Sequence, residues 1–361
     1  MMFLGTYFLL FLPGLNANWD EWWTYDGISG PDFWGLINPN WNMCERGRRQ
    51  SPINIEPNRL VYDPHLRKVH IDKHKISGYL HNAGQSVIFR VEKGAKHHVN
   101  ITGGPLVYKY RFEDLYIHFG DGNDKGSEHQ INGATFPAEL QMYGFNAELY
   151  RNMSEAQQGS NGIVGLSVMI QIGPDSNREL HNLASGFGKV VYRGQKWPIN
   201  HLSLAGLLPE TDHYMTYDGS TTHPGCWETT TWLIMNKPIY ITHQELYLLR
   251  QLMQGDQTLQ KGRMANNYRP VKNLHHRTVR TNIDFTNAHK SKACSIHREM
   301  FYAGFLKILF KDRNMIDTKF SKFELPHFRV MLSGIPSLEV MFLGSSTLPF
   351  SKELGGRDLS F

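Results

Sequence analysis

Hydrophobic and polar residues alternate with period two along much of the chain. The clearest case is the stretch 164–172, in which Val, Leu and Ile occupy the even positions and Gly, Ser, Met and Gln the odd ones. This pattern is typical of a strand with two different faces. One helix is strongly indicated, because Thr242 and Glu245 form a capping box, apolar residues follow up to Met253, and Gly255 is placed to end it. Many strands and few helices predict a mainly β fold of the α+β type.

Two of the predicted strands carry polar side chains on one face. Within 114–119 the residues Asp114, Tyr116 and His118 alternate with Leu, Ile and Phe. Within 139–143 the same alternation places Glu139, Gln141 and Tyr143 on one side. Because successive side chains of a strand point to opposite faces, two such neighbouring strands are expected to line a polar cavity.

The two ends of the chain differ from its middle. Residues 1–17 begin with a run rich in Phe and Leu and end at Ala17 before a polar stretch, which predicts a signal peptide, with a buried N-terminal helix as the alternative. After Phe285 the periodicity is lost, so we expect one domain over 18–286 and a poorly ordered extension over 287–361. An amphipathic surface helix over Met300–Phe310 is the alternative there, since 11 residues are too few to cross a bilayer.

Composition and charge exclude several classes of protein. With 40% hydrophobic and 12% aromatic residues, the chain can bury a large core, and no apolar run is long enough for a membrane span. The net charge of +5 is mostly in the extension, where 11 Lys and Arg face 7 Asp and Glu, which leaves +1 for the rest of the chain. A nearly neutral body argues against a nucleic-acid-binding protein.

Cysteines and glycosylation sequons point to secretion. The three cysteines do not form a disulfide scaffold, but in an oxidising compartment Cys44 and Cys226 are the expected pair, since Cys294 lies in the extension; three free thiols are the alternative. Asn100 and Asn152 each begin an N-glycosylation sequon. Together with the N-terminal segment, these features predict an extracellular protein.

Seven short motifs occur in the order found in α-type carbonic anhydrases, and the chain resembles that family over about residues 20–285. They are Phe33-Trp34-Gly35-Leu36, Gln50-Ser51-Pro52-Ile53-Asn54-Ile55, Gly126-Ser127-Glu128-His129, Ala138-Glu139-Leu140, Tyr214 through Ser220, Glu228 through Trp232, and Asn267-Tyr268-Arg269-Pro270. The resemblance implies a single domain built on a large, twisted, mostly antiparallel sheet with short peripheral helices. It also implies the family's reaction, the hydration of carbon dioxide at a zinc ion held by three imidazoles.

The positions that hold zinc in the family are changed here. They correspond to Tyr116, His118 and Gln141, so one imidazole of three is present. A neutral phenol and an amide oxygen are poor zinc ligands, and the loss of two imidazoles should lower metal affinity by at least about 10⁴-fold. The family's proton-shuttle position is Gln85, which cannot carry a proton. The resemblance therefore implies a protein without bound zinc or another cofactor, and without carbonate dehydratase activity.

Other parts of the family's site are present. Glu128 and Thr222 match the hydrogen-bonded pair that orients the zinc-bound hydroxide, and Glu139 and Asn267 match the groups that orient the ligands. Asp114 is a further possible partner of the ligand positions. We interpret these residues as buried polar groups that satisfy one another and are costly to remove singly.

The wall of the family's substrate pocket corresponds to Tyr143, Gly165 and Thr221. A Tyr side chain in a pocket shaped for carbon dioxide would fill part of it. This change points away from catalysis, as the changed ligand positions do.

Within the family, the chain looks most like the acatalytic carbonic anhydrase-related proteins, in particular the secreted tenth and eleventh members. The stretches Met235 through Thr242 and Arg280 through Phe285 carry this resemblance. It implies a secreted binding protein whose partners are neuronal adhesion receptors of the neurexin type. Tyr116, where a basic residue is more usual, and the long extension depart from the pattern. The alternative is an enzyme with residual activity at a rearranged metal site that combines His118 with His129 or another nearby histidine.

Overall fold

A computed structural model describes residues 23–285, except for 93 and 96. By its contacts the chain divides into two units, Met1–Lys307 and Ile308–Phe361. The described residues all belong to the first unit. The predicted signal peptide and the predicted extension lie outside the described residues, and so does Cys294.

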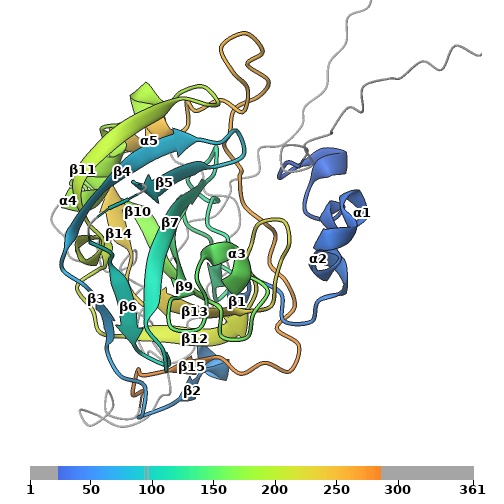
Figure 1. The fold of residues 1–361 in the computed structure, drawn as a ribbon, viewed down its shortest axis with the longest axis vertical. Helices are drawn as coiled ribbons and strands as arrows, with labels where there is room; N and C mark the ends of the chain where they lie inside the picture. The colour runs from blue at the N-terminus through green and yellow to red at the C-terminus, as the bar shows by residue number, and fades with distance from the viewer. Residues whose placement is uncertain (1–22, 93, 96, 286–361) are drawn as a thin grey trace, which may run out of the picture. The chain divides into compact units, whose positions relative to one another are not determined.

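Strands dominate the described part of the chain and confirm the expected fold class (Figure 1). The strands are β1 Asn54–Ile55, β2 Val61–Tyr62, β3 Val69–Ile71, β4 Lys75–Asn82, β5 Val87–Val91, β6 Asn100–Gly103, β7 Tyr110–Phe119, β8 Gln130–Ile131, β9 Ala138–Asn146, β10 Ile163–Ile172, β11 Lys196–Ser203, β12 Tyr214–Gly219, β13 Thr230–Met235, β14 Ile239–Ile241 and β15 Arg280–Thr281.

Helices are short and peripheral. The α-helices are α1 Trp34–Ile37, α2 Met43–Arg46, α3 Met153–Ala156, α4 Arg178–Ala184 and α5 His243–Leu249. Single 3₁₀ turns cover η2 Gly27–Ser29, η3 Pro39–Trp41, η4 Pro57–Arg59, η5 Phe187–Lys189 and η6 Ala205–Leu207. Among the residues described, none of these helices has the length and apolar character needed to cross a bilayer.

One large sheet organises the unit. Its strand order is β11-β4-β5-β7-β9-β10-β13-β12-β15-β2, with β14 paired to β10 and the β3–β6 pair attached through β6 to β7. Most neighbouring strands are antiparallel, but β10 is parallel to β13 and to β14, and β15 is parallel to β2. A separate small sheet joins β1 and β8 in parallel.

Both faces of the sheet are covered. The central strands are therefore buried on both faces, although the sequence alternation predicts one polar and one apolar face. Every residue of β9 is buried, and β10 is buried on both faces up to Ile170. One apolar layer packs under α4 and α5 and includes Leu115, Leu140 and Leu166; a second includes Ile53, Met215 and Trp232. The polar residues of β7 and β9 are therefore enclosed between the sheet and the segments that cover it.

The predicted helix is present, but it is shorter than expected. The Thr242 side chain accepts from the Glu245 N–H, and the Glu245 carboxylate accepts from the Thr242 N–H, which confirms the capping box. The helix ends at Leu249 with Arg250 as its C-cap, six residues before the position expected from Gly255. The Arg250 side chain donates to the carbonyl of Gly120, and Met253 forms a β-bridge with Arg263. These contacts with other segments replace the helix, although the apolar periodicity of the sequence continues to Met253.

Candidate functional site

The register of β7 against β9 brings the predicted polar residues face to face. Tyr116 lies opposite Gln141, His118 opposite Glu139, and Asp114 opposite Tyr143. Because residues directly opposite in an antiparallel pair have neighbouring side chains, these residues form one cluster in the centre of the sheet. The structure thus confirms that the two strands present their polar faces to one space.

The amide of Gln141 is at the centre of this cluster. Its Nε2 donates to Glu128 Oε2 at 2.8 Å and to Glu139 Oε1 at 2.9 Å. Its Oε1 accepts from the Tyr143 hydroxyl at 2.8 Å and from Thr222 Oγ1 at 3.3 Å. Both N–H groups and the carbonyl of a fully buried amide are therefore satisfied. The sequence predicted a direct pair of Glu128 and Thr222, but the Gln141 amide binds both and lies between them.

Aromatic rings close the cluster on the other side. Tyr116 stacks on His223, with ring centroids 5.6 Å apart and an angle of 9°, and Tyr143 meets both rings edge-on at 5.5 and 5.6 Å. Burial, with Asp114 nearby, raises the pKa of Tyr116, and burial with Glu128 nearby raises that of Tyr143. Both phenols are neutral at physiological pH. Burial, assisted by His118 and Arg269, lowers the pKa of His223 to about 4, so this imidazole is also neutral.

His118 is a buried histidine that is bonded through one of its ring nitrogens. Its Nδ1 donates to the backbone carbonyl of Asn267 at 2.7 Å, and Glu128 Oε1 lies 3.5 Å from the same nitrogen. The side chain of Asn267 bonds to the backbone of Ile117 and Phe119, so it attaches its own segment to β7. Asn267 thus orients the histidine through its main chain.

Glu139 accepts hydrogen bonds from several donors around it. These are the backbone N–H groups of Glu128 and His129, the His129 Nδ1, the Ser167 hydroxyl and the Gln141 amide. Burial acts to raise the pKa of Glu139, but His129 and His118 outweigh it and hold the pKa at about 2. The carboxylate is therefore charged at neutral pH, and the surrounding hydrogen-bond donors compensate its charge.

His129, which the alternative metal site combines with His118, has hydrogen-bond partners at both ring nitrogens. Its Nδ1 bonds to Glu139 at 2.8 Å and its Nε2 to the Tyr217 hydroxyl at 2.7 Å. Tyr217 in turn donates to Ser51 at 2.9 Å. Both ring nitrogens are bonded in the core, so a metal site that combines these two histidines would have to break one of these hydrogen bonds.

Two other residues have partners that the sequence did not predict. The carboxylate of Asp114 forms two hydrogen bonds with Arg90 of β5, at 2.7 and 2.9 Å, and does not support the ligand positions. The side chain of Gln85 donates to the backbone carbonyl of Trp23 at 3.2 Å, so it attaches the N-terminal segment to the end of β4. In both cases the partner comes from a segment whose position depends on the tertiary fold.

The residues mapped to the pocket wall are packed tightly. Gly165 lies opposite Tyr143 in the β9–β10 pair, and a Cβ atom on Gly165 would lie 2.8 Å from the ring of Trp232. Thr221 is buried and its N–H donates to the carbonyl of Trp227. Tyr143 itself is 2% exposed. Its ring and the Trp232 ring occupy the space beside Gly165.

Comparison with known proteins shows the family of the chain. The sequence profile of eukaryotic-type carbonic anhydrases matches residues 29–283. The chain belongs to this family. It is also 40% identical over 288 residues to carbonic anhydrase-like protein 2 of Caenorhabditis elegans, an alignment that covers 77% of this chain and 85% of that protein. The resemblance inferred from the sequence motifs is confirmed.

The residues of this carbonic anhydrase domain do not fit the family's zinc. A His₃ site needs three neutral imidazoles and an open position. At the three corresponding positions, His118 has Nε2 as its remaining nitrogen, Tyr116 keeps its proton, and both ends of the Gln141 amide are occupied. In the described part of the chain, no group of three or more His, Cys, Asp or Glu side chains is arranged to hold a metal ion.

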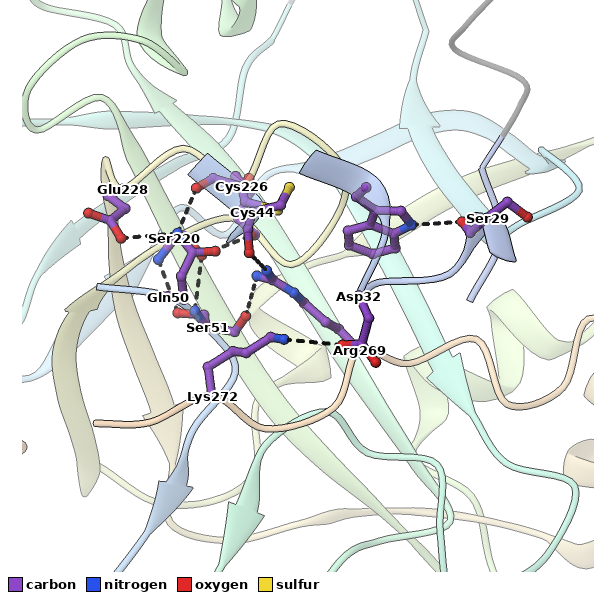
Figure 2. The surroundings of a disulfide bond; sticks show 12 residues. Ser29, Asp32, Cys44, Gln50, Ser51, Ser220, Cys226, Glu228, Arg269 and Lys272 are labelled. Carbon is purple, nitrogen blue, oxygen red and sulfur yellow. Dashed lines mark hydrogen bonds and ion pairs between the residues drawn. A yellow bond between two sulfur atoms is a disulfide. The ribbon is translucent and has the colours of Figure 1, made fainter. Parts of the chain in front are cut away.

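A disulfide joins the N-terminal helices to the loop before β13 (Figure 2). Cys44 and Cys226 are 182 residues apart in sequence, and their Cα atoms are 5.0 Å apart, which confirms the predicted pair. Beside it lies the fully buried guanidinium of Arg269, which donates to the carbonyls of Ser51 at 2.7 Å and Cys44 at 3.2 Å and lies over the ring of Trp34. Arg269 thus connects the disulfide to the polar cluster, because its backbone N–H donates to the carboxylate of Glu128.

The two sequons differ in their surroundings. The Asn152 side chain is exposed at the N-cap of α3, where its oxygen accepts from the Glu155 N–H. The Asn100 side chain, at the start of β6, is half-buried and donates to Asp72 at 2.8 Å. Of the two, Asn152 is the more accessible acceptor.

The sequence did not identify His223 or Arg90 as parts of the site. His223 follows Thr222, a residue matched to the family's site, directly in the sequence, and this position was a signal that could have identified it. Arg90 had none, because its pairing with Asp114 depends on the register of β5 against β7.

Proposed function

We propose that this protein is a secreted, non-catalytic member of the carbonic anhydrase family that acts as an extracellular protein-binding module. The observation that carries the proposal is the hydrogen bonding of Gln141. Where the family's pattern places a zinc-binding imidazole, an uncharged amide donates to two buried carboxylates and accepts from Tyr143 and Thr222. A satisfied network of this kind stabilises the domain without a metal.

The surroundings of Gln141 support loss of catalysis. Gln85, at the proton-shuttle position, cannot exchange a proton and is bonded to the N-terminal segment. Tyr143 is buried in the space where the family binds substrate, with its hydroxyl on Gln141. A variant that restored the metal alone would still lack room for substrate and a proton path.

The extracellular role rests on other features. The Cys44–Cys226 disulfide is typical of proteins that fold in an oxidising compartment. The sequons at Asn100 and Asn152 and the N-terminal segment agree with secretion. Resemblance to the secreted carbonic anhydrase-related proteins suggests adhesion receptors of the neurexin type as partners, and an occluded site leaves the outer surface as the region that binds them.

Metal content and carbon dioxide hydration test the proposal together. The secreted wild-type protein should contain less than about 0.1 zinc per chain and should not exceed the uncatalysed rate. The positive control is the triple variant Tyr116→His, Gln141→His, Tyr143→Val, which supplies three imidazoles and removes the phenol that bonds to residue 141. It should bind zinc stoichiometrically and gain weak activity. Equimolar zinc with hydration activity in the wild type would refute the proposal.

Receptor binding is tested separately. A purified neurexin-type ectodomain is immobilised, and binding of wild type is compared with that of Tyr143→Ala, which changes the buried cluster only. Equal affinity for both proteins is expected. Loss of binding in a folded Tyr143→Ala variant would mean that the cluster itself recognises the partner, and no binding by wild type would exclude this receptor class.

A further inference from the structure

A groove on the surface lies next to the disulfide and shares no lining residue with the buried polar cluster. Its volume is about 550 Å³, within the range of small-molecule sites. Two tryptophans and four amide side chains dominate its lining: Trp41, Trp227, Asn38, Asn40, Asn42 and Gln158. None of the described residues that line it carries a charge.

The two tryptophans are held in place by neighbouring covalent and packing constraints. Trp41 is three residues before Cys44, and Trp227 follows Cys226, so the disulfide connects the two walls of the groove. Gly225 has φ of +103°, and a Cβ there would lie 2.4 Å from the Trp227 ring, so the ring lies directly against this glycine. A site whose aromatic walls are already fixed loses little entropy when a ligand binds.

The polar groups of the groove are available to a ligand. The side chains of Asn40, Asn42 and Gln158 are exposed, and within the described residues they make no hydrogen bond to the protein. Trp41 is buried, 6% exposed, and Trp227 is half-buried; within the described residues neither indole N–H donates to the protein. Amides offer both donors and acceptors, and each indole offers a donor.

We propose that this groove binds a neutral saccharide. A pyranose ring has an apolar face of C–H groups that packs on an indole, and hydroxyl or acetamido groups at its edge that pair with amides, which matches a lining of Trp, Asn and Gln. The absence of charge from the described lining disfavours sulfated or phosphorylated ligands, because nothing there compensates an anion. The proposal does not rest on the proposed function, since the groove uses none of the residues around Gln141.

Such a saccharide can come from this chain or from another molecule. Asn152, an exposed sequon residue, caps α3, and Gln158 in the groove follows the same helix. The four residues of α3 span about 6 Å along the helix axis, and Gln158 lies two residues beyond its end, which is within reach of a glycan. A glycan on Asn152 and a glycan on a partner therefore offer the same chemistry to the groove.

The test uses the secreted full-length protein, in its glycosylated form and as Asn152→Gln. The indole N–H resonances of uniformly ¹⁵N-labelled protein are followed by NMR during titration with N,N′-diacetylchitobiose, mannotriose, cellobiose and a sulfated heparin disaccharide. Resonances of Trp41 and Trp227 should shift with at least one neutral sugar and not with the sulfated one. Trp227→Ala should weaken binding at least about tenfold. Gln158→Ala, an exposed position that leaves the fold intact, should weaken it by a smaller factor.

The control is Trp197→Ala, which removes a more exposed tryptophan, 38%, from the edge strand β11. It should leave binding unchanged. If added sugar binds Asn152→Gln but not the glycosylated protein, the chain's own glycan occupies the groove; equal binding to both assigns the groove to a glycan of another molecule. No shift of either indole with any neutral sugar in folded Asn152→Gln, or equal loss in Trp197→Ala, overturns the proposal.

Discussion

Replacing Gln141 by Leu tests whether the amide stabilises the buried cluster. The change keeps the side chain's size but removes two hydrogen bonds to carboxylates, at 2.8 Å to Glu128 and 2.9 Å to Glu139. It also removes the acceptor of the Tyr143 hydroxyl. Hydrogen bonds to charged groups contribute about 1.5–3 kcal/mol each, and Leu regains part of this by burying more apolar surface. We expect a net loss of about 3–4 kcal/mol in the free energy of unfolding.

The loss is measured by equilibrium unfolding in urea at pH 7, and by a fall of at least about 6 °C in the thermal midpoint. Gln260→Leu is the matched control, because Gln260 is exposed and its amide lies 3.4 Å from the Tyr192 hydroxyl; it should change stability by less than about 0.5 kcal/mol. Gln141→Glu, which adds a third carboxylate, should be less stable than Gln141→Leu at pH 7 and should recover as the pH falls. A Gln141→Leu protein within about 1 kcal/mol of wild type would refute the role assigned to the amide.

Three further predictions concern other parts of the chain. Cys44→Ser opens a loop that is closed between residues 182 apart. If loop-closure entropy acts alone, the free energy of unfolding should fall by about 5 kcal/mol, and secretion should be reduced. Peptide mapping of the wild-type protein should find Cys44 linked to Cys226. The His223 pKa is lowered to about 4 in the folded protein, so the unfolded chain takes up the proton first, and stability should fall by about 2 kcal/mol between pH 7.5 and 5. That component should be missing from His223→Gln in matched urea titrations. Truncation at residue 287 should leave the thermal midpoint within about 4 °C of the full chain, and a larger drop would show that the extension packs on the domain.

Much about this protein is determined by the sequence alone. Period-two alternation identifies β7 and β9 as strands and places Tyr116, His118 and Gln141 on polar faces, because side-chain direction in a strand depends only on the parity of the position. The ordered motifs identify the family, and the local hydrogen bonds of Thr242 and Glu245 define a helix start that needs no distant partner. These features depend either on residues close together in the sequence or on which residue types the motifs contain.

Apart from the Cys44–Cys226 disulfide, the partnerships between distant segments around the site were decided by the tertiary structure. Arg90 reaches Asp114 because β5 and β7 pair in one particular register, and the Gln141 amide separates Glu128 from Thr222 because three segments converge on it. The early end of α5 has the same origin, since the residues after Leu249 bond to other parts of the fold. A hydrogen bond depends on distances of a few tenths of an ångström, and those distances follow from the packing of the whole sheet, which no local pattern in the chain encodes.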